Sequence, residues 1–163
     1  MKKIIIIATA LLMTVSVFAQ DGKSIYNKYS DMQDVSSVYI SPAMFRLMGR
    51  LPDIEVSDGT SFNLGAFVHS LTGMYIINSE NKDINSSLKS EAERMISKGR
   101  YEMLMEVKDS GETVRMYTSG NDKIIDSFVF LVKEVNECTF ICFDGKMDRA
   151  EVEKAVAATM KNR

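Results

Sequence analysis

Histidine and cysteine, the residue types that most often supply nucleophiles, bases and zinc ligands, are scarce in this 163-residue chain. His69 is the only histidine. It falls off the apolar stripe of the helix predicted around it, which is typical of a solvated residue, and no nucleophile motif lies nearby. Cys138 and Cys142 lack the spacing of a zinc site. We therefore expect no metal site and no cofactor.

The two cysteines lie in the strand-like run "NECTFICFDG". A four-residue offset within a strand places both side chains on one face, about 13 Å apart. A disulfide needs Cα atoms within about 7 Å, so the two cannot pair with each other inside one strand. We expect two small buried side chains. An intermolecular disulfide or a reactive thiol is the alternative.

Paired carboxylates and methionines are the other candidates for chemistry. Glu102 and Glu106 share a predicted strand face with Arg115, so charge pairing across the strands explains them better than acid-base catalysis does. The pairs Met44/Met48 and Met103/Met105 have spacings that could hold Cu(I), but both lie on predicted core-facing stripes. The glycines form no phosphate-binding motif. No pattern assigns a catalytic residue, and we expect a non-catalytic protein.

The first twenty residues have the pattern of a secretory signal peptide. A basic start is followed by an apolar run over 4–18, and Val17-Phe18-Ala19 fits a signal-peptidase site. We predict cleavage between Ala19 and Gln20, and hence export to the periplasm or the medium. The apolar run is shorter than the ~20 residues of a spanning helix, and no cysteine follows it to accept a lipid. We expect neither a membrane span nor a lipid anchor in the mature chain.

The rest of the chain is predicted to be one α+β domain over residues 20–163. It carries 18 basic and 22 acidic residues without runs, which argues against nucleic acid as a partner. Helices are predicted over 22–33, 42–50, 63–71, 83–98 and 148–161, and strands over 38–40, 74–78, 101–108, 112–118, 124–132 and 138–143. The last four strands form an antiparallel meander, and the helix over 83–98 crosses over to it from the strand over 74–78.

Helix ends and turns are also predicted. Asp21, Ser41 and Asp148 are expected N-caps, and Gly99 is expected to end its helix in the left-handed conformation. Residues 51–61 are turn-rich and predict a mobile loop.

The two faces of the predicted sheet differ in their apolar pattern. The hairpin over 101–118 alternates, with the following side chains expected inward: Tyr101, Met103, Met105, Val107, Val114 and Met116. The outer face is expected to carry Glu102, Glu106, Lys108, Arg115 and Tyr117. By contrast, 124–132 and 138–143 are apolar on both faces. Either the N-terminal helices fold back over the second face, or a partner or second copy covers it.

Three segments together resemble a known family. The helix "SIYNKYSDMQDV", the strand and helix "SSVYISPAMFRLM" and the strand "LTGMYIINSE" are similar to domain-of-unknown-function family 4252. The resemblance implies a small exported envelope protein of Gram-negative bacteria of the Bacteroides type, with no established activity and no catalytic residues to transfer. Many members are lipid-anchored. This chain lacks the lipid-accepting cysteine, which favours a soluble periplasmic or secreted form.

Taken together, these patterns favour a non-catalytic interaction or adaptor module of the cell envelope that binds a protein partner or itself. The expected binding surface is the outer face of the hairpin, with Arg115, Tyr117 and Glu106. One alternative is a ligand-binding protein or enzyme with a pocket under 51–61, lined by Asp53, Glu55 or His69. Another is a self-assembling structural protein.

Overall fold

The computed structural model describes residues 21–48, 54–56, 60–62 and 64–153. The predicted signal peptide, with Ala19 and Gln20, lies outside these residues, as does most of the predicted last helix. The helices are α2 (Gly22–Tyr29), α3 (Pro42–Met48), α4 (Leu64–Ser70) and α5 (Lys82–Lys98), and residues 149–153 are also helical. The strands are β1 (Val35–Ile40), β2 (Ile54–Val56), β3 (Thr60–Phe62), β4 (Leu71–Ser79), β5 (Glu102–Asp109), β6 (Glu112–Gly120), β7 (Ile124–Lys133) and β8 (Cys138–Asp148).

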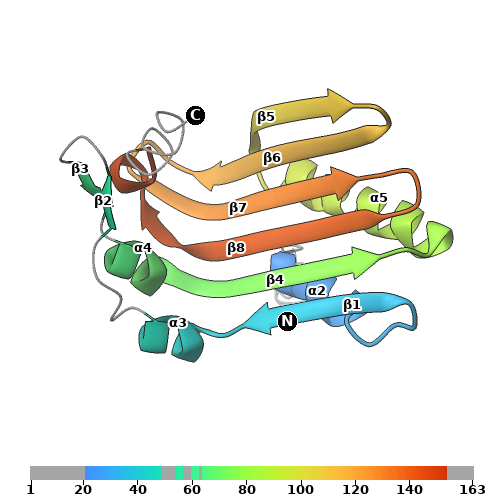
Figure 1. Ribbon diagram of the computed structural model, residues 1–163, viewed down its shortest axis with the longest axis horizontal. Helices are drawn as coiled ribbons and strands as arrows, with labels where there is room; N and C mark the ends of the chain where they lie inside the picture. The colour runs from blue at the N-terminus through green and yellow to red at the C-terminus, as the bar shows by residue number, and fades with distance from the viewer. Residues whose placement is uncertain (1–20, 49–53, 57–59, 63, 154–163) are drawn as a thin grey trace, which may run out of the picture.

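Six strands form one antiparallel sheet in the order β1-β4-β8-β7-β6-β5 (Figure 1). The predicted α+β class and the meander from β5 to β8 are confirmed. Helix α5 crosses the sheet from β4 to β5 at the far edge. The predicted strand over 38–40 is longer than expected and forms the opposite edge. The 51–61 segment is not a plain loop, because β2 and β3 pair within it as a small hairpin.

The predicted N-caps are present. The side chain of Asp21 accepts a hydrogen bond from the backbone N–H of Ser24 at 2.8 Å. Ser41 Oγ accepts one from Met44 at 3.3 Å, and Asp148 Oδ1 accepts one from the N–H of Glu151 at 3.2 Å. These acceptors satisfy backbone donors that the first turn of a helix leaves without partners.

The prediction for Gly99 is wrong. Its φ is −85°, and Arg100 takes the left-handed conformation instead, with φ of 55°. A Cβ at position 99 would lie only 2.7 Å from a ring carbon of Tyr101. Glycine is therefore needed for the close approach of an aromatic ring, and not for its backbone freedom. Helix α2 also ends at Tyr29, four residues earlier than predicted.

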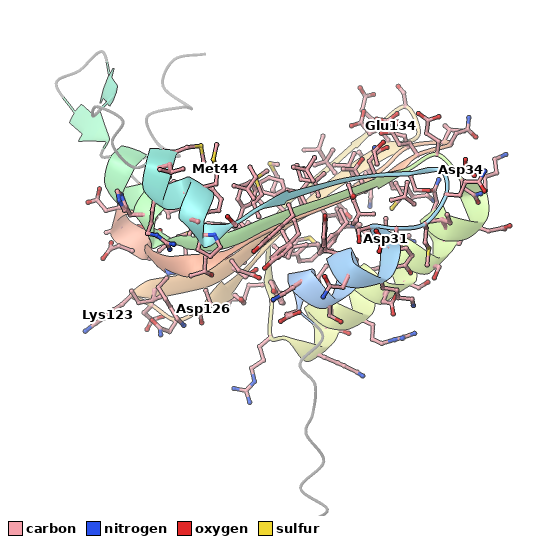
Figure 2. The ribbon with its side chains drawn as sticks, turned by 90° about the horizontal axis from the view of Figure 1, so that it is seen from below. Asp31, Asp34, Met44, Lys123, Asp126 and Glu134 are labelled. Carbon is pink, nitrogen blue, oxygen red and sulfur yellow. The ribbon has the colours of Figure 1, made fainter. Side chains whose placement is uncertain are left out.

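The main core lies between one face of the sheet and helices α2 and α5, which both pack beneath it (Figure 2). On each central strand, alternate residues point into this core and are almost fully buried. We call this face of the sheet the helix-side face. A second cluster joins α3, α4 and the helical residues after β8 to one end of the other face. Its buried members are Phe45, Val68, Leu71, Ile125, Met147 and Val152.

Candidate functional site

The face of the sheet opposite α2 and α5 has a mostly apolar surface. We define this open face by three rows of residues that pair across the strands. The first row is Ile40, Met74, Phe143, Phe128, Thr118 and Glu102. The middle row is Val38, Ile76, Ile141, Phe130, Met116 and Met105. The third row is Ser36, Asn78, Thr139, Val132, Val114 and Val107.

Among the described residues of the three rows, the side chains remain accessible except for Thr118, which is 1% exposed. At the two sheet edges, Val38 is 47% exposed, Met105 41% and Val107 46%. Members on the central strands, such as Ile141 and Phe130, are half-buried. On the helix-side face of the same strands, Phe140 is fully buried. The difference arises because helices cover only one face, as Figure 2 shows with side chains standing free above the sheet.

The middle and third rows contain no charged side chain. Their few polar groups are serine, asparagine and threonine. Asn78 Nδ2 donates to Thr139 Oγ1 at 2.8 Å and also to the Glu137 carboxylate. Because Asn78 and Thr139 bond each other, covering them with an apolar surface costs less than covering unpaired donors.

The open face has a different boundary at each end. At one end α3 and α4 pack on the first row, where Ile40, Met74, Phe128 and Phe143 contact the second core cluster. At the other end the strand termini and turns bring acidic residues together, near the labelled Asp34 and Glu134 in Figure 2. We call this the acidic end; it comprises Asp34, Glu80, Asp109, Glu112, Glu134 and Glu137. The open face is thus bounded at one end by helices α3 and α4, which we call the α3–α4 wall, and at the other end by acidic side chains.

A β-bulge in β5 changes the faces that the alternating pattern predicted. Met103 pairs with Tyr117, whereas Met105 pairs with Met116, so the register shifts at Leu104. The two methionines therefore point to opposite faces. All of β5 is exposed, so the expectation that Met103, Met105 and Val107 are core residues is wrong. The bulge also prevents Met103 and Met105 from sharing one Cu(I) ion.

Glu106, Arg115 and Tyr117 were expected together on an exposed binding face, but they do not form such a surface. Tyr117 is buried in the main core, with 7% of its surface exposed, so its predicted exposure is wrong. Arg115 Nε donates to Glu106 Oε2 at 2.7 Å, and its Nη1 lies 3.2 Å from Glu93 on α5. Hydrogen bonds from Lys108 and then from Arg115 lower the pKa of Glu106, and the bond to Glu106 raises the pKa of Arg115. The error arises because α5 packs on the face that alternation marked as polar, where Tyr117 joins the core cluster that contains the buried α5 residues. That these residues bind a partner stays a prediction.

A small polar cluster lies inside the helix-side core. Cys142 Sγ is 3.4 Å from both Ser127 Oγ and Asp144 Oδ1. Burial raises the pKa of Cys142 well above its usual value, and that of Asp144 as well. Burial also raises the pKa of Tyr101 to about 12. A thiol kept protonated is a poor nucleophile at neutral pH, so this cluster has the properties of a satisfied polar interior.

The remaining predicted site residues are dispersed. Cys138 and Cys142 are both free and buried on the helix-side face, as expected, and burial raises the pKa of Cys138 to about 11. His69 is exposed on α4. The side chains of Asp53 and Glu55 lie outside those that the structure describes. Within the described part of the chain, no group of three potential metal ligands comes together, and no helix has both the length and the apolar character to cross a bilayer.

Sequence reasoning did not single out the open-face residues as a site, although it contained the signal for them. The apolar pattern on both faces of 124–132 and 138–143 indicated a second face in need of cover. The structure shows that α3 and α4 cover only one end of it. The alternative in which the N-terminal helices cover the whole face is therefore wrong for the described residues.

Residues 29–155 match the model of the family described as "Domain of unknown function (DUF4252)". The match spans β1 to the helical residues after β8, and so includes the whole six-stranded sheet. No curated protein matches the chain in sequence.

Proposed function

This chain belongs to the DUF4252 family, and we propose that it is an exported, non-catalytic interaction module of the cell envelope that binds through its open face. The open apolar face is the observation that carries this proposal. Contiguous apolar patches larger than a few hundred Å² are uncommon on monomeric proteins, and such patches mark contact surfaces. Export is supported by the signal-peptide pattern at the N-terminus.

The chemistry of the open face favours a protein partner. A small-molecule site needs a concave pocket with a few convergent polar groups, whereas this face is a sheet surface on which Asn78 and Thr139 already bond each other. An anionic membrane or nucleic acid is disfavoured by the acidic end and by the net charge of −2. A flat apolar surface of another protein matches the face in both shape and polarity.

The expected binding mode differs from the one that Arg115 and Tyr117 suggested. Tyr117 already fills a place in the core, and Arg115 is already paired with two carboxylates. Removing either side chain would therefore disturb folding or local packing before it disturbed a contact. Met105 and Val107 are better reporters, because both are exposed and lie on the open face.

Photo-crosslinking in living cells tests this proposal, with the reactive amino acid placed at Met105 or, as a matched control, at Met103. Both are methionines on β5 with similar exposure, but they point to opposite faces. We expect a discrete adduct from position 105 and little from position 103. Absence of an adduct at 105, or equal adducts at both positions, would contradict an open-face interaction.

A further inference from the structure

We propose that the partner on the open face is a second copy of this chain, packed sheet against sheet about a two-fold axis. The axis would lie midway between the sheets and run across the strands, so that the middle row packs on its own counterpart. This inference rests on the proposed function, because it identifies the occupant of the same surface. The product would be a four-layer dimer with α2 and α5 outermost on both sides.

The free part of the open face has the size of a weak dimer contact. Six strands spaced about 4.8 Å apart, with the two rows that α3 and α4 leave free about 6.7 Å apart, span roughly 390 Å² of flat area. Two copies together would bury about 780 Å², which lies in the range of weak, transient interfaces below ~1,200 Å². Met44 on α3 is also exposed and lies on the same side of the sheet as the open face (Figure 2). An interface of this size predicts a dimer that dissociates on dilution.

The open face is compatible with itself. A face that packs on its own copy must not place like charges against each other, and the middle and third rows are neutral. Stacked sheets pack face to face about 10 Å apart with interdigitating apolar side chains. The middle row supplies such side chains on all six strands, from Val38 at one edge to Met105 at the other.

The two ends of the face determine which two-fold orientation is possible. A two-fold axis along the strands would place the two acidic ends together and bring the two α3–α4 walls into collision. An axis across the strands keeps the two acidic ends apart and also keeps the two α3–α4 walls apart. It places each acidic end beside the α3–α4 end of the other copy, where Arg46 is exposed on α3. Steric fit and charge therefore favour the same arrangement.

A different route to self-association, pairing through the edge strand β5, is less favourable. The free edge of β5 carries the bulge at Leu104, and its side chains include Glu102, Glu106, Lys108 and Asp109. Bulges and edge charges are devices that prevent edge-to-edge pairing.

Sedimentation velocity of the purified exported chain, from about 1 µM to about 500 µM, tests the proposal against two variants. Met105→Glu would place two carboxylates against each other across the axis, whereas Met103→Glu adds the same charge on the helix-side face of the same strand. We expect the unaltered chain and Met103→Glu to form a dimer at the upper concentrations. For Met105→Glu we expect the dissociation constant to rise about 100-fold. Chemical unfolding of each variant checks that all are folded.

Each outcome decides the proposal. A strict monomer throughout the concentration range overturns it, and so does a dimer weakened equally by both substitutions or by neither. If the purified chain is monomeric while position 105 crosslinks to a different protein in cells, the dimer is excluded and the interaction module stands. If neither experiment gives a product at 105, both proposals fail.

Discussion

At the scale of single residues, one close contact in the main core joins the first turn of α2 to β8. Gly22 packs directly on Cys142, and a Cβ at position 22 would overlap both the Sγ and the Cβ of that cysteine. The same cysteine side chain contacts Ser127 and Asp144. Gly22 and Cys142 are therefore matched in size, and their contact sets how closely α2 approaches the sheet.

We predict that Gly22→Ala lowers the free energy of unfolding by about 1–3 kcal/mol, because it overfills a packed site. In a Cys142→Ala background the same substitution should lower the free energy of unfolding clearly less, because the sulfur atom that the added methyl group would overlap is absent. Urea unfolding of the four proteins in this double-mutant cycle measures the coupling. Equal costs in the two backgrounds would show that the contact is unimportant.

At the scale of elements, hydrogen bonds from Tyr29 and Lys28 hold α2 against α5. Tyr29 is 1% exposed. Its hydroxyl donates to Glu91 Oε2 at 2.7 Å and lies 2.8 Å from Ser87 Oγ. Lys28 also bonds Glu91, at 2.7 Å. Tyr26 on the same helix packs instead through its ring. The centre of this ring lies 5.9 Å from that of Tyr39 and 5.8 Å from that of Tyr75.

Tyr29→Phe should destabilise the protein by about 1–2 kcal/mol, because a buried hydrogen bond to a carboxylate is lost while the ring is kept. Tyr26→Phe is the matched control on α2, and its expected cost is below about 0.5 kcal/mol. Thermal and urea unfolding compare the two variants with the unaltered chain. A cost for Tyr26→Phe as large as that for Tyr29→Phe would argue against the α2–α5 hydrogen bonds as the cause.

At the scale of the whole molecule, several buried groups are held in their protonated form. Burial raises the pKa of Tyr75 and Tyr101 to about 12 and that of Cys138 to about 11. In an unfolded chain these groups lose their protons at about pH 8.5 for cysteine and about pH 10 for tyrosine. Above those values the unfolded state releases protons that the folded state retains, which favours unfolding.

Stability is therefore expected to be unaffected by these groups below about pH 8.5 and to fall as the pH rises toward their folded-state pKa values. Urea midpoints between pH 7 and pH 11 measure the decline. Tyr101→Phe removes one titrating group, so its curve should fall less steeply above about pH 10 than that of the unaltered chain. A flat midpoint through pH 11 would mean that the buried hydroxyl and thiol groups titrate normally.

Most of the local structure was predictable from the sequence, for reasons that lie within a few residues. Asp21, Ser41 and Asp148 cap helices because each has a side-chain oxygen beside orphan N–H groups. The 3.6-residue stripe of α5, the alternation of the hairpin over 101–118 and the apolar runs of β7 and β8 predicted the α+β meander. The candidate site was only half predictable: the apolar pattern indicated a second face, but it could not say where any cover lay.

The sequence by itself thus determined the α+β class, the meander, the helix caps and the pattern of a leader peptide, because periodicity and capping depend on neighbours in the chain. Only the tertiary structure decided which sheet face is open. One bulge at Leu104 places Met103 and Met105 on opposite faces, and α5 buries Tyr117 that alternation had marked as exposed. A register shift and the path of a crossover helix arise from contacts between distant segments, and no pattern within one strand contains them.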